Sequence, residues 1–279
     1  MYKIRTMTRA DIDLAIEWAS NEGWNPGIND AESFYNTDPN GFFMGELDGE
    51  PIGCISAVAY DNTFGFIGFY IVKAKYRGKY YGIKLWNKAM EYLNQRTIGL
   101  DGVVGQQENY RKSGFKLAYR NIRFEGVSRK SETIPNFIRS INDVPNADIL
   151  DYDDLLFPVS RHEFVKTWIY QSGVVALAAY EYKKLKGYGV IRPCQSGFKI
   201  GPLFANEQAT AQALYNALTS SIKPGEPVYL DVSEINESAV KLAENNLMDK
   251  VFETARMYTD DVDSVLLDQL FGVTSFELG

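Results

Sequence analysis

The chemistry that this sequence indicates most clearly is the binding of a ligand with phosphate groups. Residues 62–90 carry no acidic side chain and six basic ones: Lys73, Lys75, Arg77, Lys79, Lys84 and Lys88. They surround a glycine-containing stretch that follows a predicted apolar strand and opens an amphipathic helix at Gly82. The first N–H groups of a helix have no partner within it, and its dipole favours negative charge there. The stretch therefore predicts an anion site that suits several phosphates.

Other catalytic chemistries have little support in the sequence. The chain has one histidine, His162, and two cysteines, Cys54 and Cys194. This set supplies no His/Cys cluster for zinc, so we predict no metal site. No nucleophile motif lies near His162, which argues against a Ser-His-Asp or Cys-His system. We expect His162 to be a surface or capping residue at the start of a helix.

The composition predicts a two-domain protein of the cytoplasm. The chain has 279 residues and a hydrophobic content of 45%, which is enough for two packed cores. No stretch approaches the ~20 apolar residues of a membrane span, and the N-terminus has no apolar signal segment, so no membrane partner is expected. The two cysteines lie far apart in sequence, and we expect both to be reduced thiols.

Acidic residues are concentrated in the second half of the chain. The net charge is −7, and residues 126–279 hold 14 basic and 21 acidic side chains. Because binding to a nucleic-acid backbone needs a basic surface, we do not expect nucleic acid as a partner. The acidity is compatible with a cationic acceptor, and equally with a contribution to solubility.

Helices and strands alternate around the predicted anion site. In chain order, the elements predicted for the first half are a helix capped by Thr8 and Asp11, a loop at 23–27, strands at 42–47, 51–60 and 64–72, a helix from Gly82, a strand at 102–105, a short helix around Tyr110 and a strand at 115–124. The Asp48-Gly49 dipeptide is a strong turn signal between the first two strands.

The second half repeats this order at low sequence identity. Its predicted elements are strands at 174–182, 185–191 and 199–205, a helix at 207–220, a strand at 228–232, a helix at 237–246 and a strand at 251–258. A duplication of this kind fixes the architecture. We therefore predict a mixed α/β protein with domains at 1–126 and 147–279, joined by a polar linker at 127–146. The second copy passes from strand to helix through 203–207 and lacks the basic glycine turn, so only the first copy keeps the anion site.

Two segments of the first half resemble a known family. Residues 71–85 resemble the acetyl-CoA-binding motif of GNAT-type N-acetyltransferases, in which an apolar strand leads into Arg-Gly-x-Gly-x-Gly/Ala and a helix. Arg77, Gly78 and Gly82 match this motif, whereas Tyr80 stands where the family usually has glycine. Residues 108–115 resemble the Tyr-x-x-x-Gly-Phe element of the family, with Tyr110 at its tyrosine. The resemblance covers residues 1–125, and the duplicated layout is similar to two-domain GNAT proteins.

The resemblance implies a fold, a cofactor and a reaction. It implies tandem GNAT-like domains, each a twisted, mostly antiparallel sheet flanked by helices. It also implies direct transfer of the acetyl group of acetyl-CoA to a primary amine of a small molecule, with Tyr110 as the general acid for the leaving thiolate. The implied acetyl-CoA site comprises Tyr70, Ile71, Val72, Lys73, Arg77, Gly78, Lys79, Tyr80, Tyr81, Gly82, Ile83, Lys84 and Tyr110. The residues implied beside the acceptor are Glu22, Trp24 and Asn25.

Several alternatives stay open at this point. No motif marks a general base, and the candidates are Glu22, Glu46, Asp61 or a chain of waters. Two other functions remain: a non-catalytic acyl-CoA-binding regulatory protein, which Tyr80 and the unmarked base favour, and a transferase for a longer acyl chain. The second domain either shapes the acceptor site or packs structurally. The oligomeric state is open, with an internal pseudo-dimer of the two domains as one arrangement.

Overall fold

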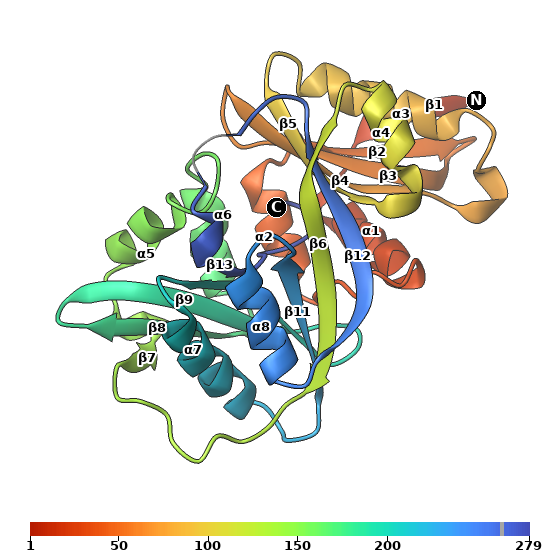
Figure 1. Ribbon diagram of the computed structural model, residues 1–279. Coiled ribbons are helices and arrows are strands. Elements are labelled where there is room, and N and C mark those ends of the chain that lie inside the picture. The colour runs from red at the N-terminus through yellow and green to blue at the C-terminus, as the bar shows by residue number, and fades with distance from the viewer. Residues whose placement is uncertain (263–264) are drawn as a thin grey trace.

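The computed structural model describes residues 1–262 and 265–279 of the chain. Within these ranges, thirteen strands form one sheet in the order β1-β2-β3-β4-β5-β12-β6-β11-β10-β9-β8-β7, with β13 beside β10 (Figure 1). The strands are β1 (Tyr2–Thr6), β2 (Phe42–Leu47), β3 (Glu50–Ala59), β4 (Phe64–Val72), β5 (Thr97–Val103), β6 (Lys116–Val127), β7 (Ile138–Ser140), β8 (Val175–Glu181), β9 (Lys184–Pro193), β10 (Phe198–Ala205), β11 (Pro227–Ser233), β12 (Asp249–Tyr258) and β13 (Leu270–Gly272). The helices are α1 (Arg9–Asn21), α2 (Asp30–Thr37), α3 (Tyr81–Tyr92), α4 (Gln107–Lys112), α5 (Asn146–Asp153), α6 (His162–Ile169), α7 (Gln208–Ser220) and α8 (Glu237–Asn245).

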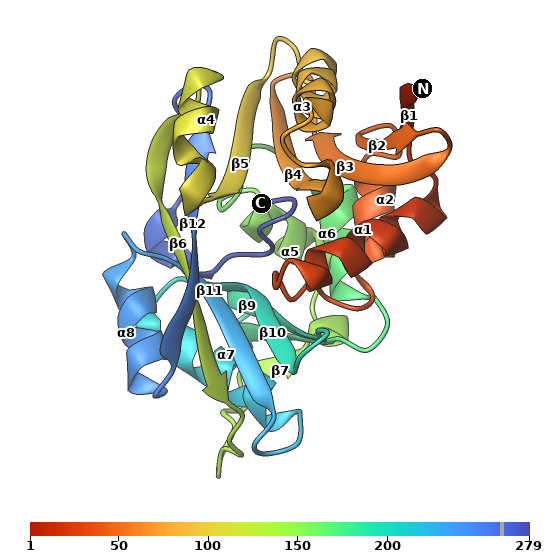
Figure 2. The ribbon, with the colours of Figure 1, turned by 90° about the vertical axis from the view of Figure 1, so that its right-hand side faces the viewer.

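The two halves of the chain are joined by an exchange of strands. β6 comes from the first half of the sequence but pairs with β11, and β12 comes from the second half but pairs with β5. β6 and β12 also pair with each other, and Figures 1 and 2 show these two long strands running between the halves. The predicted arrangement of two helix-flanked, mostly antiparallel sheets is confirmed, and the exchange connects the two sheets into one.

Alternate side chains of the strands enter different cores. In β2, Phe42 and Met44 face the core that contains α1 and α2, whereas Phe43 faces the core that contains α3. β3 alternates in the same way. This period of two is what a strand with both faces covered requires. The first-half sheet is therefore packed between α3 on one face and α1 and α2 on the other.

Helices from the two halves share one of these cores. α2 packs against α6, where the rings of Phe34 and Trp168 stack with their centroids 5.9 Å apart. A buried ion pair crosses the same boundary, with Arg192 Nε 3.1 Å from Asp30 Oδ1. His162 begins α6, as predicted, and its Nε2 lies 2.9 Å from a carboxylate oxygen of Asp154. Among the helices of the described ranges, none is long and apolar enough to cross a membrane.

Candidate active site

A cavity of about 480 Å³ opens where β4 and β5 separate. The two strands pair in parallel only between residues 64–67 and 97–100. Beyond this stretch β4 bulges, because its register against β3 shifts between Cys54 and Ser56 and Phe69 adopts a left-handed φ of 45°. A bulge bends its strand away from the local sheet direction. The facing edges of β4 and β5 therefore line an opening instead of forming a ladder.

The turn from β4 into α3 forms one end of this cavity. Gly78 and Tyr80 have φ values of 72° and 64°, and in the described ranges no group accepts from the N–H of Gly78, Lys79 or Tyr80. The first turn of α3 adds further free N–H groups. Gly82 lets the helix approach β4, since a Cβ there would lie 2.7 Å from the Tyr70 hydroxyl. The turn is a cradle of main-chain donors for an anion.

Tyr80 occupies this turn in a conformation that favours glycine. A left-handed residue with a Cβ costs about 1–2 kcal/mol. The Tyr80 side chain is 80% exposed. A tyrosine at this position therefore strains the backbone and leaves the turn open to solvent.

Acidic residues from other elements reach the basic stretch. Glu50 lies 3.1 Å from Lys75 Nζ and 3.6 Å from Lys73 Nζ. Arg77 forms an ion pair with Glu22, and its Nε donates to a main-chain carbonyl. Acidic residues from outside the stretch 62–90 thus neutralise part of its positive charge in the folded protein. An anion that binds Arg77 must compete with Glu22.

Two of the predicted phosphate-binding lysines are free of such pairs. Lys79 and Lys84 have no ion-pair partner among the residues that the structure describes, and their Nζ atoms lie 5.8 and 5.4 Å from the ring centroids of Tyr76 and Tyr2. A lysine over an aromatic face is only weakly held. Both cations can therefore turn toward a phosphate at the α3 N-terminus.

The cavity gathers most of the predicted cofactor residues. Its lining includes Tyr70, Ile71, Val72, Arg77, Gly78, Tyr80, Gly82, Ile83 and Tyr110. The predicted residues outside this described lining are Lys73, Lys79, Tyr81 and Lys84.

Only some of the predicted acceptor residues and general bases line the cavity. Glu22 and Trp24 line the cavity, whereas Asn25 is held to the second half by two hydrogen bonds with the main chain of Ser196. Glu46 accepts from Arg5, and Asp61 accepts from the N–H groups of its own turn; neither belongs to the lining described by the structure.

Tyr110 lies on α4 beside the opening. Its ring packs against Trp86, with the centroids 5.6 Å apart, and against the main chain of Gly102. Burial and the nearby Tyr70 raise the pKa of Tyr110 to about 12. The phenol is therefore protonated at neutral pH and can donate a hydrogen bond into the cavity.

The inner end of the cavity is built by elements that sequence reasoning did not place there. The exchanged strand β12 supplies Phe252 and Thr254, and the C-terminal segment supplies Phe276 and Glu277. The remaining lining residues are Ile67, Gly68, Phe69, Tyr76, Trp86, Leu100, Asp101, Gly102, Val103 and Gln106. The one local signal was Glu277 itself, an acid within the mainly apolar stretch 270–278.

The second half has a similar opening, and the chain fills it. β10 and β11 pair in parallel only between residues 198–200 and 228–230, and β10 shifts register against β9 just afterwards. β13 occupies this place: it pairs with β10, and Val273 N–H donates to Asp231 O at 2.8 Å. α7 follows β10 after residues 206–207, without a glycine turn. Of the two similar openings, the chain leaves the one in the first half accessible.

Two parallel strands that separate beside a cradle of main-chain donors form a site that suits an elongated ligand with phosphate groups at one end. The chain matches the "Acetyltransferase (GNAT) family" at residues 12–115 and an "Acetyltransferase (GNAT) domain" at residues 149–271. It therefore belongs to the GNAT family as a tandem pair of GNAT domains, and it is an acyl-CoA-dependent N-acyltransferase.

Individual relatives agree with this assignment. The chain is 28% identical to a holothin acyltransferase of Pseudoalteromonas sp. (strain SANK 73390) over 263 residues, which covers 94% of this chain and 90% of the relative. Its fold is similar to that of a candidate acetyltransferase from Pyrococcus horikoshii, with a TM-score of 0.85, 22% identity and coverage of 100% and 96% of the two chains. It is also similar to a tandem GNAT protein from the clavulanic acid pathway, with a TM-score of 0.66, 11% identity and coverage of 94% and 100%.

Proposed function

We propose that the protein transfers the acetyl group of acetyl-CoA to a primary amine of a small molecule, and that the reaction takes place in the cavity between β4 and β5. The observation that carries this proposal is the continuity of one cavity from the main-chain cradle at 78–83 to Tyr110. The cradle and the two free lysines suit the phosphates of the cofactor, and the edge of β4 at 70–72 that faces β5 without pairing to it suits its amide-bearing arm.

The residues of this cavity meet the needs of acyl transfer. The bound thioester supplies an activated acyl group, and its carbonyl oxygen needs a hydrogen-bond donor when negative charge develops. Main-chain N–H groups of the bulged part of β4 are the donors in our proposal. Tyr110 faces the leaving sulfur. Because burial raises the pKa of its phenol to about 12, Tyr110 is protonated at neutral pH and can donate to the leaving thiolate. In our proposal Tyr110 stabilises the leaving group by this hydrogen bond, and the proton that finally neutralises the sulfur comes from the amine.

A longer acyl chain is the second candidate. The cavity continues past the paired part of β4 toward the apolar side chains of Phe252 and Phe276, where carbon atoms beyond an acetyl group would have room. The relative from Pseudoalteromonas is named an acyltransferase, a term that is broader than acetyltransferase. The non-catalytic alternative is not retained, because the family and this relative are enzymes.

The second half shapes the inner end of the cavity in this proposal, through residues of β12 and of the C-terminal segment. We keep 1–126 and 147–279 as the two GNAT-like units, joined by 127–146 and packed as an internal pseudo-dimer, with β13 closing the second opening. We also propose a cytoplasmic location, which the two free, buried cysteines support.

Two measurements test the proposed function. Calorimetry with acetyl-, butyryl- and hexanoyl-CoA measures whether the chain binds these thioesters and which length it prefers. A thiol-release assay with polyamines, amino acids, aminoglycosides and holothin then measures transfer. We expect binding of acetyl-CoA and amine-dependent thiol release. Binding without transfer to any amine would refute the proposed reaction, and a preference for hexanoyl-CoA would favour the second candidate.

A further inference from the structure

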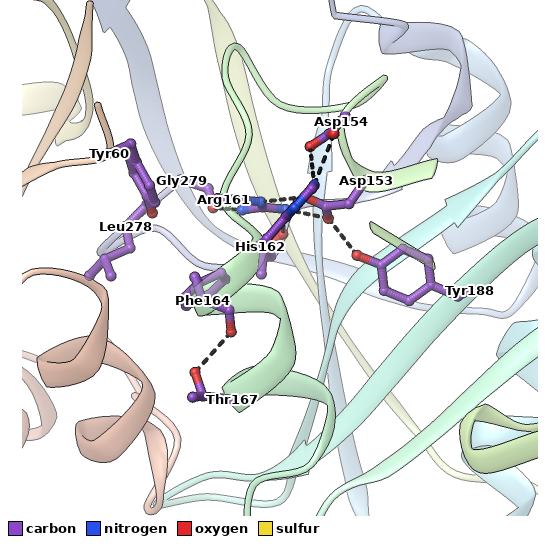
Figure 3. Close-up of polar contacts among 11 residues, drawn as sticks. Tyr60, Asp153, Asp154, Arg161, His162, Phe164, Thr167, Tyr188, Leu278 and Gly279 are labelled. Atoms are coloured by element: carbon purple, nitrogen blue, oxygen red, sulfur yellow. Dashed lines mark hydrogen bonds and ion pairs between the residues drawn. The ribbon is translucent and has the colours of Figure 1, made fainter. Parts of the chain in front are cut away.

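The C-terminal residues 273–279 lie at the centre of the molecule, between its two halves (Figures 1 and 2). The hydroxyl of Tyr60, from the first half, donates to Leu278 O at 2.7 Å. Arg161, from the second half, donates to Gly279 O at 3.0 Å (Figure 3). Arg161 is itself held by Asp153 through contacts of 2.8 and 3.0 Å. Anchors from both halves therefore fix the position of this segment.

Glu277 lies within this anchored segment and reaches the inner end of the cavity. Its carbonyl oxygen packs so closely on β4 that a Cβ at Gly68 would overlap it. Glu277 lines the cavity and is only 4% exposed. In the described part of the chain, no group donates to its carboxylate, yet neither carboxylate oxygen is completely sealed. A buried carboxylate without a donor is costly unless a partner meets it.

A purely structural role for Glu277 has to be weighed against this. The charged groups that act on its surroundings come from five elements: Asp30 on α2, Arg123 on β6, Arg192 on β9, Lys199 on β10 and Asp231 on β11. Two of these cations already have a buried carboxylate, since Arg123 Nε lies 2.6 Å from Asp231 Oδ1 and Arg192 pairs with Asp30.

Lys199 is the remaining cation, and within the described ranges its ammonium group bonds to a main-chain oxygen and forms no ion pair with Glu277. Its Nζ donates to Asn25 O at 2.8 Å. Burial and the neighbouring Arg123 lower the pKa of Lys199, whereas the nearby Asp231 and Glu277 oppose this shift. The Glu277 carboxylate lines the cavity without an ion-pair or hydrogen-bond partner in the described part of the chain, so it is free to meet a cation that enters there.

We propose that Glu277 is the residue that binds the ammonium group of the acceptor and takes its proton. This inference rests on the proposed function, which names no general base for the amine, and it assigns that role to Glu277. One N–H bond of the ammonium breaks and an O–H bond forms on Glu277. The neutral amine then forms the C–N bond to the acyl carbon while the C–S bond breaks. A second nitrogen proton passes to the thiolate sulfur, and Glu277 returns its proton to water. The acceptor is a primary amine that is protonated in solution.

The matched pair Glu277→Gln and Asp268→Asn tests this role. Both changes remove one carboxylate without changing size, and Asp268 is an exposed residue of the same C-terminal stretch, outside the described lining. In the thiol-release assay at saturating acyl-CoA, we expect Glu277→Gln to lower kcat/KM for the amine by about 100-fold. The Kd for acyl-CoA should stay within about twofold, and Asp268→Asn should behave like the natural chain.

The pH dependence separates a base from a structural residue. Without its base, the Glu277→Gln variant depends on neutral amine from solution, so its rate should rise by about tenfold per pH unit below the pKa of the amine. The natural chain, and the charge-retaining variant Glu277→Asp, should show a shallower rise. An unchanged kcat/KM in Glu277→Gln, or equal pH slopes in the three proteins, overturns the role of Glu277 alone. A natural chain that binds acyl-CoA but acylates no amine overturns both this role and the proposed function.

Discussion

The ring of Tyr110 lies directly on the main chain of Gly102, so that a Cβ at Gly102 would overlap Tyr110 Cε2. The two residues come from β5 and from the short helix that follows it. A glycine on β5 thus provides the space in which the phenol reaches the opening beside β4. The position of the Tyr110 hydroxyl therefore depends on residue 102 having no side chain.

The first prediction concerns Gly102→Ala. We expect the added methyl group to displace the Tyr110 ring and to lower kcat by about 10- to 100-fold, because small displacements of a catalytic group are costly. Gly105→Ala is the matched control, since a Cβ there meets nothing within 4 Å. Both kcat values come from the thiol-release assay. Equal rates in the two variants would show that the placement of this ring does not matter.

Removal of the hydroxyl alone gives the second prediction. Tyr110→Phe should lower kcat by about 10- to 100-fold with an unchanged Kd for acyl-CoA, because the ring keeps its packing while the hydrogen bond to the leaving sulfur is lost. The raised pKa of about 12 keeps the phenol protonated below that value, and its donor function is lost only as the pH rises through 12. The kcat of the natural chain should therefore show no decline due to Tyr110 between pH 7 and 10. An alkaline decline in this range that disappears in the Phe variant would contradict the assignment.

The third prediction concerns the ion pair between Arg77 and Glu22 at the mouth of the cavity. If Arg77 exchanges Glu22 for a phosphate, Arg77→Ala should weaken acyl-CoA binding by about tenfold, and more strongly at low salt. Glu22→Gln should not weaken binding, because it removes the competitor of the phosphate. Lys88→Ala serves as a control, since Lys88 is paired with Glu91 on the surface of α3. Calorimetry at two salt concentrations would decide, and an unchanged affinity in Arg77→Ala would place the phosphates elsewhere.

Local patterns predicted much of the fold. The strands predicted at 42–47 and 64–72 agree with β2 and β4 to the residue, and the helix predicted after Thr8 begins with the expected capping box to Asp11. These signals act within a few residues and do not depend on the rest of the chain. The strand predicted at 102–105 was wrong at both ends, because β5 begins at Thr97 and ends at Val103. Gly99 and Asp101 are poor strand formers, and pairing with β4 and β12 overrides that preference.

The candidate site also has a part that local sequence patterns predict and a part that they do not. Its outer end, from Arg77 to Gly82, follows from a local turn and could be predicted. Its inner end contains Thr254 and Glu277, which are more than 150 residues away from β4 in sequence. β6 and β12 both mix charged and apolar residues, so the pattern of each does not say which partner strand it takes. The strand exchange, and with it the inner wall of the cavity, is a property of the whole chain.

The exchanged strand β6 supports a fourth prediction. Arg123 on β6 stands directly opposite Asp231 on β11, and both are buried in a two-contact ion pair of 2.6 and 2.7 Å. Removal of one partner leaves the other charge buried, so Asp231→Asn should lower the free energy of unfolding by about 3–5 kcal/mol. The double variant Arg123→Met, Asp231→Leu should lose less than Asp231→Asn alone. Urea unfolding measures both, and a double variant that is less stable than Asp231→Asn would argue against this explanation.

The last prediction concerns Tyr80, the non-glycine residue in the turn before α3. Its φ of 64° is costly with a Cβ, while its side chain is 80% exposed and contributes little packing. Glycine relieves the strain but also gains freedom in the unfolded chain, which offsets part of the effect. We therefore expect Tyr80→Gly to raise the free energy of unfolding by about 0.5 kcal/mol and to leave acyl-CoA affinity within about twofold. Tyr80→Ala keeps the Cβ and should show no such gain. If urea unfolding shows that Tyr80→Gly is less stable than Tyr80→Ala, the tyrosine backbone is not strained in solution, and the turn holds its shape for another reason.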